Sequence, residues 1–414
     1  MIITAVAVGT RGDVAPLAEL GEEMISRGHR FRILTSGAFR QLVESKGVEF
    51  SLLDTDADHV MKYLVTEYKT SLDFAKGMFR LKKENPSFME QTLAAVRGSD
   101  LIMYGTCAAF ARHAAEYLGI PCARVFYSPM DPTSQYSLYT DHFDSESVRK
   151  SYRHIRIGMN IMTMFALNKW RRSARLAKWK ANSTYTDLNG RKVLTFYPVS
   201  PQLMPPDPDW GNHIHVTGYW YHPEESSAAY KAPEDLAAFL SSGPKPIFVT
   251  FGMAESHDLA ILQRRTVEAL KNAGIRAVIQ AFQLPEKDKY NTDLLYFIGN
   301  VPYSYIFDKV RAVVHHGGNT TNGMGLRAGL PTLVIPLALD QYFYGRMDHR
   351  LNLGPRPLYI RRKLCTAFEI RDALTDLVSG KYDRAAKDIG RKIRNENGIK
   401  IAADTIEKYV ESQG

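Results

Sequence analysis

One stretch of the sequence joins a histidine, two glycines and two hydroxyl residues where a strand pattern gives way to a helix. The apolar run Ala312–His315 is typical of a buried strand, and His316 with the next two glycines leads into Thr320 and Thr321. Glycines let the backbone approach a ligand closely, and free amides at the start of a helix favour an anion. The threonine hydroxyls add hydrogen bonds, and the histidine adds a charge-assisted one worth about 1.5–3 kcal/mol. The segment lacks the P-loop pattern but suits a phosphate or pyrophosphate. A glycine turn with an N-capping threonine is the alternative.

A second polar pair follows the next strand pattern. Thr332–Ile335 is bracketed by prolines, and the loop beyond it ends in Asp340 and Gln341. We expect this loop at the carboxyl edge of the sheet, where doubly wound folds bind ligands. A carboxylate beside an amide offers acceptors and donors side by side, which suits neighbouring sugar hydroxyls. A helix N-cap with a solvated neighbour is the alternative.

These residues need parallel strands to position them, and the sequence alternates strand and helix patterns twice. Ile2–Val8 is an apolar, β-branched run that ends in a glycine turn before a helical pattern, which predicts a right-handed βαβ unit. The alternation stops in a proline-rich stretch and restarts at Ile247–Phe251. We therefore predict an α/β protein of two facing, Rossmann-like, doubly wound domains with a ligand cleft between them. The expected ranges are 1–215 for the first domain, 216–243 for a linker, 244–388 for the second domain and 389–414 for a C-terminal helix packed back on the first domain.

The composition excludes several other classes of protein. Of the 414 residues, 45% are hydrophobic and 23% are charged, which is typical of a globular chain and not of a disordered one. No run reaches the ~18–20 apolar residues of a membrane-spanning helix, and the N-terminus lacks the basic start of a signal peptide. The three cysteines are far apart and form no CxxC pair, which excludes a disulfide framework and a cysteine-built zinc site. We therefore expect a cytoplasmic protein.

Positive charge is concentrated in one segment of the chain. The net charge is +9, and ten Lys or Arg residues without any Asp or Glu lie between Arg149 and Lys180, so the remainder is close to neutral. Large apolar side chains are interleaved with these cations. The segment is either a pair of helices with a buried apolar face, or a peripheral contact with an anionic membrane surface or a lipid-like acceptor. Nucleic acid is not an expected partner, because no stacking platform or zinc finger accompanies the charge.

A resemblance to a known family runs through these motifs. The donor-binding signature of GT-B nucleotide-sugar glycosyltransferases, in the UDP-glucosyltransferase superfamily, is similar to HHGGNTTNGMGLRAGLPTLVIPLALDQ at 315–341. The bacterial and fungal branch, which includes sterol glucosyltransferases and macrolide and glycopeptide antibiotic glycosyltransferases, also resembles RGDVAP at 11–16, HVTGYW at 215–220 and IGNVP at 298–302. The resemblance implies transfer of a hexose, glucose from UDP-glucose, to a small acceptor with inversion and without a metal or cofactor. A dTDP-deoxysugar transferase of antibiotic biosynthesis is the alternative.

The resemblance also implies a donor site. The residues implied for the pyrophosphate are Gly252, His316, Gly318, Asn319, Thr320 and Thr321. The sugar hydroxyls would be bound by Asp340 and Gln341, and the edge of the nucleobase by the backbone of Val301. Two positions depart from the family pattern, because Met253 stands where serine is usual and Asn322 ends a motif that is usually Ala-Gly-Thr-Thr.

Asp13 lies where this branch has its general base, in the loop after the first strand. A carboxylate at a helix N-terminus is stabilised as an anion by the helix dipole, so it stays ionised at neutral pH. Facing an acceptor, it would take the proton of the attacking hydroxyl, which is typically worth 10²–10⁴-fold in rate. The alternative is a helix cap without a catalytic role.

For the acceptor, the sequence favours a hydrophobic molecule such as a polyketide, a sterol or another lipid. Aromatic and methionine side chains in the middle of the first domain suit an adaptable apolar pocket. The residues expected to line it are Tyr127, Met130, Met159 and Met162.

Two other classes of function compete with a glycosyltransferase. A dinucleotide-dependent oxidoreductase needs GxGxxG after its first strand, and the turn Gly9–Asp13 lacks the third glycine. A nucleotide-sugar-binding auxiliary protein without turnover would fit the departures at Met253 and Asn322. The candidate site residues Asp13, His316, Asp340 and Gln341 are all present, which favours an enzyme.

Overall fold

The computed structural model describes residues 1–54, 87–137, 145–178, 192–221, 230–252, 257–280, 291–337, 340–359 and 365–413, without the side chains of 145, 154–166 and 257. The chain forms two compact units, one of Met1–Tyr221 with Asn397–Gly414 and the other of His222–Glu396. The division after Tyr221 differs from the expected linker at 216–243, since 217–221 belongs to the first unit and the described residues 230–243 belong to the second. The cleft between the two units stays a prediction.

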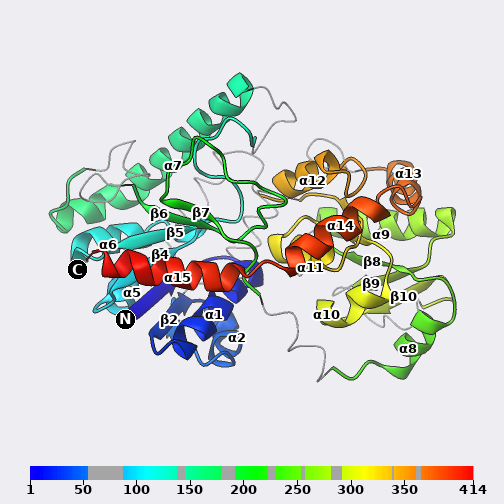
Figure 1. Ribbon diagram of the computed structural model, residues 1–414, viewed down its shortest axis with the longest axis horizontal. Coiled ribbons are helices and arrows are strands. Elements are labelled where there is room, and N and C mark those ends of the chain that lie inside the picture. The colour runs from blue at the N-terminus through cyan, green and yellow to red at the C-terminus, as the bar shows by residue number, and fades with distance from the viewer. Residues whose placement is uncertain are drawn as a thin grey trace. The chain divides into compact units, whose positions relative to one another are not determined.

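The first unit is built on a seven-stranded sheet in the order β3-β2-β1-β4-β5-β6-β7 (Figure 1), and all of its neighbouring strands are parallel. The central strands are short apolar runs that are buried on both faces, as parallel strands require. The order reverses between β1 and β4, so the loops after these two strands diverge at the carboxyl edge, where doubly wound sheets bind ligands. The strands are β1 (Ile2–Val6), β2 (Arg30–Thr35), β3 (Glu49–Leu52), β4 (Leu101–Tyr104), β5 (Cys122–Val125), β6 (Leu194–Tyr197) and β7 (Ile214–Val216).

Helices cover both faces of this sheet. On β1, Ile3 and Ala5 join a core with α1 and α15, whereas Val6 joins a core with α5 and α6 on the opposite face. This alternation follows from the two-residue period of a strand. The helices of this unit are α1 (Arg11–Ser26), α2 (Arg40–Glu44), α5 (Phe88–Val96), α6 (Ala111–Leu118), α7 (Ser145–Ser173) and α15 (Gly398–Glu411), with short 3₁₀ turns at Gly37–Phe39 and Thr106–Ala108.

Residues 145–173 of the basic region form a single 29-residue helix, α7, where one of the two alternatives expected a pair of helices. The physical reason is that 145–173 contains no proline and only one glycine, and a lone glycine costs a helix about 1 kcal/mol. Side chains near both ends anchor it. The Tyr152 hydroxyl donates to the Tyr136 carbonyl (2.9 Å), and Arg171 donates to both carboxylate oxygens of Glu116 on α6 (2.6 and 2.7 Å). No helix within the described ranges is both long and apolar enough to span a membrane.

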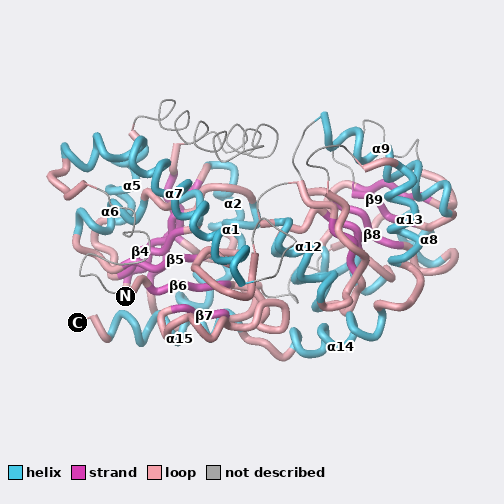
Figure 2. Tube along the Cα trace, turned by 90° about the horizontal axis from the view of Figure 1, so that it is seen from above, coloured by secondary structure: helices cyan, strands magenta, loops and turns pink. Residues whose placement is uncertain are grey.

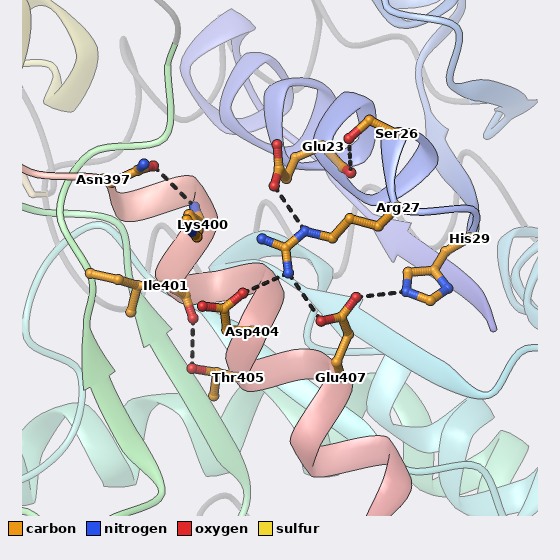
Figure 3. Close-up of polar contacts among 10 residues, drawn as sticks. All are labelled: Glu23, Ser26, Arg27, His29, Asn397, Lys400, Ile401, Asp404, Thr405 and Glu407. Carbon is orange, nitrogen blue, oxygen red and sulfur yellow. Dashed lines mark hydrogen bonds and ion pairs between the residues drawn. The ribbon is translucent and has the colours of Figure 1, made fainter.

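The C-terminal helix docks on the first unit through a polar cluster beside an apolar seam (Figure 3). Directly after α1, Arg27 binds Glu23 (2.8 Å) and reaches Asp404 (2.6 Å) and Glu407 (3.0 Å) on α15. The ring of His29 lies 2.9 Å from Glu407. The apolar side of α15 joins the core that also holds Trp220 and α1, so the last turns of the chain complete the first unit.

The single helix predicted for 389–414 is two helices. The chain breaks between α14 (Asp383–Arg394) and α15, where the Asn397 side chain accepts a hydrogen bond from the Lys400 amide (3.3 Å) and caps the new helix. A Cβ on Gly398 would overlap the carbonyl of Gly218, so a glycine is needed for the close approach. The cap and this packing against the first unit end the earlier helix.

The second unit has a five-stranded parallel sheet in the order β10-β9-β8-β11-β12, with helices on both faces (Figure 2). Its strands are β8 (Ile247–Thr250), β9 (Ala277–Gln280), β10 (Leu295–Ile298), β11 (Val313–His315) and β12 (Thr332–Val334). One face packs on α9 and α13, and the other on α8, α10 and the turn that follows it. The helices are α8 (Glu234–Ser241), α9 (His257–Ala273), α10 (Tyr303–Ile306), α11 (Asn319–Arg327), α12 (Gln341–Arg350), α13 (Ala367–Leu377) and α14, with a 3₁₀ turn at Phe307–Lys309.

Candidate functional site

Asp13 lies in the first turn of α1, at the carboxyl end of β1 and beside the point where the strand order reverses. It forms a capping box with Thr10. Its Oδ2 accepts from the Thr10 amide (2.7 Å) and hydroxyl (3.0 Å), and the Thr10 hydroxyl accepts from the Gly12 amide (3.1 Å). A Cβ on Gly9 would overlap Asp13 Oδ2, so the turn requires a glycine there. Both hydrogen bonds from Thr10 are made to Oδ2 and neither uses Oδ1.

The environment of Asp13 differs from the expectation based on the helix dipole alone. Burial raises the pKa of the Asp13 carboxyl above its ordinary value, and the hydrogen bonds from Thr10 act against that rise. A carboxylate with a raised pKa is a stronger base than a free aspartate, as a general base requires. The cap and a proton-accepting role are therefore compatible, because each uses a different oxygen.

The loop after β5 brings Tyr127 to Asp13. The Tyr127 hydroxyl donates to the Asp13 backbone carbonyl at 3.3 Å. Met130 lies three residues further on, and its amide donates to the Tyr197 hydroxyl (3.0 Å). Both side chains are half-buried. The other two residues predicted for the acceptor, Met159 and Met162, lie on α7, and their side chains fall outside the described residues.

Sequence reasoning missed the buried polar cluster beneath this loop. Arg124 is 1% exposed and binds Asp131 Oδ1 at 2.6 Å, while the Tyr197 hydroxyl donates to Asp131 Oδ2 at 2.6 Å. Arg124 also donates to the Thr195 hydroxyl (2.9 Å). Because the Met130 amide donates to Tyr197, this cluster fixes the backbone of the loop after β5. An arginine inside the apolar strand 122–125 is the signal that could have pointed to it, because a buried cation must be paired.

Exposed cations near the two ends of α7 lie on different sides of the helix. Arg149 and Arg153 are exposed near its start, and Lys169 and Arg172 near its end. At 100° per residue, Lys169 is rotated by about 200° from Arg149. These cations therefore do not form one flat basic face.

In the second unit, His316 lies between two glycines at the start of α11. A Cβ on Gly318 would come within 2.6 Å of its Nε2, and a Cβ on Gly252 within 3.2 Å of its Cε1. Gly252 and Gly317 have φ of +77° and +92°, which only glycine adopts readily. The structure therefore brings together three of the predicted donor positions, Gly252, His316 and Gly318, at the carboxyl edge of this sheet.

Burial decides the charge of the His316 ring in the protein by itself. Burial lowers the pKa of His316 to about 4, although a hydrogen bond with the Thr250 backbone acts in the opposite direction. The ring is therefore neutral at pH 7. A cationic ring would require the negative charge of a bound pyrophosphate to raise its pKa.

The polar side chains of α11 differ in whether other described residues contact them. The hydroxyl of Thr320 is bonded to no described residue, whereas Thr321 lies 3.2 Å from the Tyr303 hydroxyl. Asn319 is buried and its Oδ1 accepts from Tyr344 on α12 (2.6 Å). Asn322 is fully buried and its amide donates to Asp348 (3.3 Å). The departure from the family motif at Asn322 therefore serves the interior of the unit.

Asp340 and Gln341 begin α12, next to the glycine turn. A Cβ on Gly317 would lie 2.9 Å from the Gln341 carbonyl, so α12 starts against that turn. Gln341 Oε1 accepts from the Leu337 amide (2.8 Å), and the Asp340 carbonyl accepts from the Phe343 amide (2.9 Å). The Gln341 side chain thus also closes its own loop, a use that the sequence prediction did not include.

Val301 follows β10 at the same edge. Its side chain is buried in the core, and neither its amide nor its carbonyl bonds a described residue. Buried backbone groups are normally paired, so both groups are suited to a ligand. The departure at Met253 falls outside the described residues.

Comparison with known proteins relates both units to glycosyltransferases. Residues 3–137 match the glycosyltransferase family 28 N-terminal domain. The chain is 29% identical to a sterol 3-beta-glucosyltransferase of Candida albicans over 99% of its own length, and 30% identical to one of Yarrowia lipolytica over 98%. It spans 28% of the length of each of these two relatives.

Solved structures show the fold. The glycotransferase of kitacinnamycin aligns with a TM-score of 0.73 at 19% identity over 98% of both chains. CalG4, the calicheamicin glycosyltransferase, aligns with a TM-score of 0.72 at 18% identity over 99% of this chain and 98% of its own. The predicted fold class, GT-B with two Rossmann-like parallel α/β units, is confirmed.

Proposed function

We propose that this chain, whose residues 3–137 match the glycosyltransferase family 28 N-terminal domain, transfers a hexose from a nucleoside diphosphate sugar to a hydroxyl of a hydrophobic small molecule. The observation that carries the proposal is 28–30% identity to sterol 3-beta-glucosyltransferases along 97–99% of the chain. That similarity runs through both units. Support also comes from the carboxyl edges of the two sheets, where Asp13 and the start of α11 are candidates for the base and the anion-binding group that such a transfer needs.

The reaction would use Asp13 as general base. The acceptor oxygen attacks the anomeric carbon from the side opposite the diphosphate, so the new C–O bond forms as the bond to the phosphate oxygen breaks and the configuration inverts. The hydroxyl proton passes to Asp13 Oδ1, while Oδ2 stays in the capping box. The departing diphosphate carries the electron pair of the broken bond.

The leaving diphosphate would be stabilised at the start of α11. Free amides of the first turn, the Thr320 hydroxyl and the ring of His316 provide hydrogen-bond donors, and the helix dipole favours the negative charge there. We assign this stabilisation to the protein and not to a metal ion. Asp340 and Gln341 would bind the sugar hydroxyls and the backbone of Val301 the base edge.

The donor we propose is UDP-glucose, in line with the glucosyltransferase relatives. A dTDP-sugar is the second candidate, because the spinosyn rhamnosyltransferase SpnG, solved with thymidine diphosphate, aligns with a TM-score of 0.68. The acceptor we propose is a sterol or a similar apolar alcohol that contacts Tyr127 and Met130. Peripheral membrane contact through 149–180 stays a prediction. The cytoplasmic location stays a prediction.

Calorimetric titration with UDP, dTDP, UDP-glucose and NAD tests the donor site. Binding of UDP and UDP-glucose without NAD supports the proposal, and preference for dTDP selects the second candidate. Binding of NAD alone contradicts both. Turnover is then measured as UDP release with a sterol in cyclodextrin, against a polar alcohol as control; release only with the control would contradict the apolar acceptor.

A further inference from the structure

The last residues of neighbouring strands in the second unit form one buried row. His315 pairs in register with Thr250, Thr250 with Gln280, and Gln280 with Ile298. Three of these four side chains are polar, and each polar one is at most 5% exposed. Residues in register on parallel strands point to the same face. Two residues earlier on the same face of the sheet, Phe248 and its neighbours form an apolar surface. The polar row lies at the carboxyl end of that surface.

Each polar residue of this row bonds the loop that follows a strand. The Gly317 amide donates to His315 Nδ1 at 2.9 Å. Gln280 Nε2 donates to the Gly299 carbonyl at 3.2 Å, and Gln280 Oε1 accepts from the Thr250 hydroxyl at 2.7 Å. A longer contact of 3.4 Å joins the Gly252 amide to the Thr250 hydroxyl.

These three loops carry the donor residues of the proposed function. Gly317 separates His316 from Gly318, so its left-handed backbone sets where the ring and the start of α11 face. Gly299 lies two residues before Val301. The row thus joins the loop proposed for the pyrophosphate to the loop proposed for the nucleobase, although its own side chains are buried beneath both.

We infer that His315, Thr250 and Gln280 are positioning residues that set donor selectivity by bonding these loops. His315 fixes the pyrophosphate loop, and Gln280 fixes the nucleobase loop. The inference rests on the proposed function and deepens it. Burial lowers the pKa of His315 to about 3, so its ring is neutral at pH 7 and Nδ1 remains able to accept the Gly317 amide.

The test measures two affinity ratios by calorimetry. The ratio of the UMP to the UDP dissociation constant reports the contribution of the second phosphate, and the ratio of ADP to UDP reports base discrimination. His315→Gln should shrink the first ratio about tenfold and leave the second unchanged. Gln280→Met should shrink the second about tenfold and leave the first unchanged.

His315→Asn is the rescue variant. Its Oδ1 lies near the position of Nδ1, whereas the oxygen of His315→Gln lies near Nε2, so the Asn variant should keep the wild-type phosphate ratio. Thr266→Val is the control for destabilisation, because Thr266 is equally buried in this unit but bonds only its own helix, at Leu262. It should lower the melting temperature and leave both ratios unchanged.

The outcomes separate the two proposals. If all row variants lose affinity uniformly, or lose only thermal stability as the Thr266 variant does, the positioning roles are overturned and the proposed function stands. If the wild-type protein binds neither UDP nor dTDP, the proposed function fails and takes this inference with it. Should His315→Gln not fold, Thr250→Val provides the same test, with a loss in both ratios expected because its hydroxyl bonds Gln280 and faces the Gly252 loop.

Discussion

The carboxyl edges of the two sheets present their chemistry in different ways. In the first unit the important group is one carboxylate, which is held by a capping box within four residues of the chain. In the second unit the candidate groups are a neutral ring and backbone amides, held by contacts from the end of β11, the loop after β8 and helix α12. A charged group can be placed by a local motif, because one strong interaction suffices. An anion site made of backbone must be assembled from distant segments, because amides have no side chain to reach with.

The largest effect should come from removing the carboxylate of the first edge. In Asp13→Asn, turnover should fall about 10²-fold or more while UDP affinity stays within twofold, because the amide cannot accept the hydroxyl proton. The measurement is kcat with UDP-glucose together with a UDP titration. Glu369→Gln is the matched control, since Glu369 forms the same capping box with Thr366 on α13. Wild-type turnover in Asp13→Asn would show that the box is only a cap.

Removing the ring of the second edge should instead affect binding. His316→Ala should weaken UDP affinity about tenfold, the loss of one hydrogen bond of roughly 1.4 kcal/mol. Calorimetry provides the measurement, and His349→Ala on α12 is the control in the same unit. If His316→Ala binds UDP normally but turns over slowly, His316 contributes to the chemical step and the predicted role in UDP binding is wrong.

The two edges should respond to pH with opposite signs. If Asp13 is the proposed base, kcat/KM should fall about tenfold per pH unit below its pKa, and because burial raises that pKa the fall should begin at a higher pH than for an ordinary aspartate. The pKa of His316 is about 4 in the protein alone and must rise beside a diphosphate, so binding takes up a proton and UDP affinity gains as pH falls. The difference between wild type and His316→Ala, titrated in parallel, isolates this gain from the titration of UDP itself. Equal slopes for the two proteins would contradict it.

The smallest effect concerns the far end of the helix that carries Asp13. Arg27→Met should reduce the free energy of unfolding by about 1 kcal/mol, and less at high salt, because its partners on α15 are partly solvated. Denaturant unfolding measures this change in the free energy of unfolding. The control is Arg371→Met, which removes the exposed ion pair between Arg371 and Asp372. Turnover should change less than twofold. A large loss of turnover would mean that Asp13 depends on α15, contrary to its local placement.

Much of the strand framework was predictable because parallel strands buried on both faces are short apolar runs. The patterns at 247–251, 312–315 and 332–335 each differ by one residue from β8, β11 and β12. The strands β6 and β7 were missed, because the prolines between them are typical of a linker. The break before α15 was also missed, because its cause is packing against Gly218, nearly two hundred residues away.

The sequence by itself determined the order of elements, the glycines that permit left-handed turns, and the candidates Asp13, His316, Asp340 and Gln341. These follow from local periodicity, from the conformational freedom of glycine and from residue chemistry. Only the tertiary structure decided that Asp13 has a raised pKa, that His316 is neutral, that Gln341 also closes its own loop, and that a buried polar row lies beneath the donor loops. These properties depend on burial and on strand register, which bring together residues far apart in the chain.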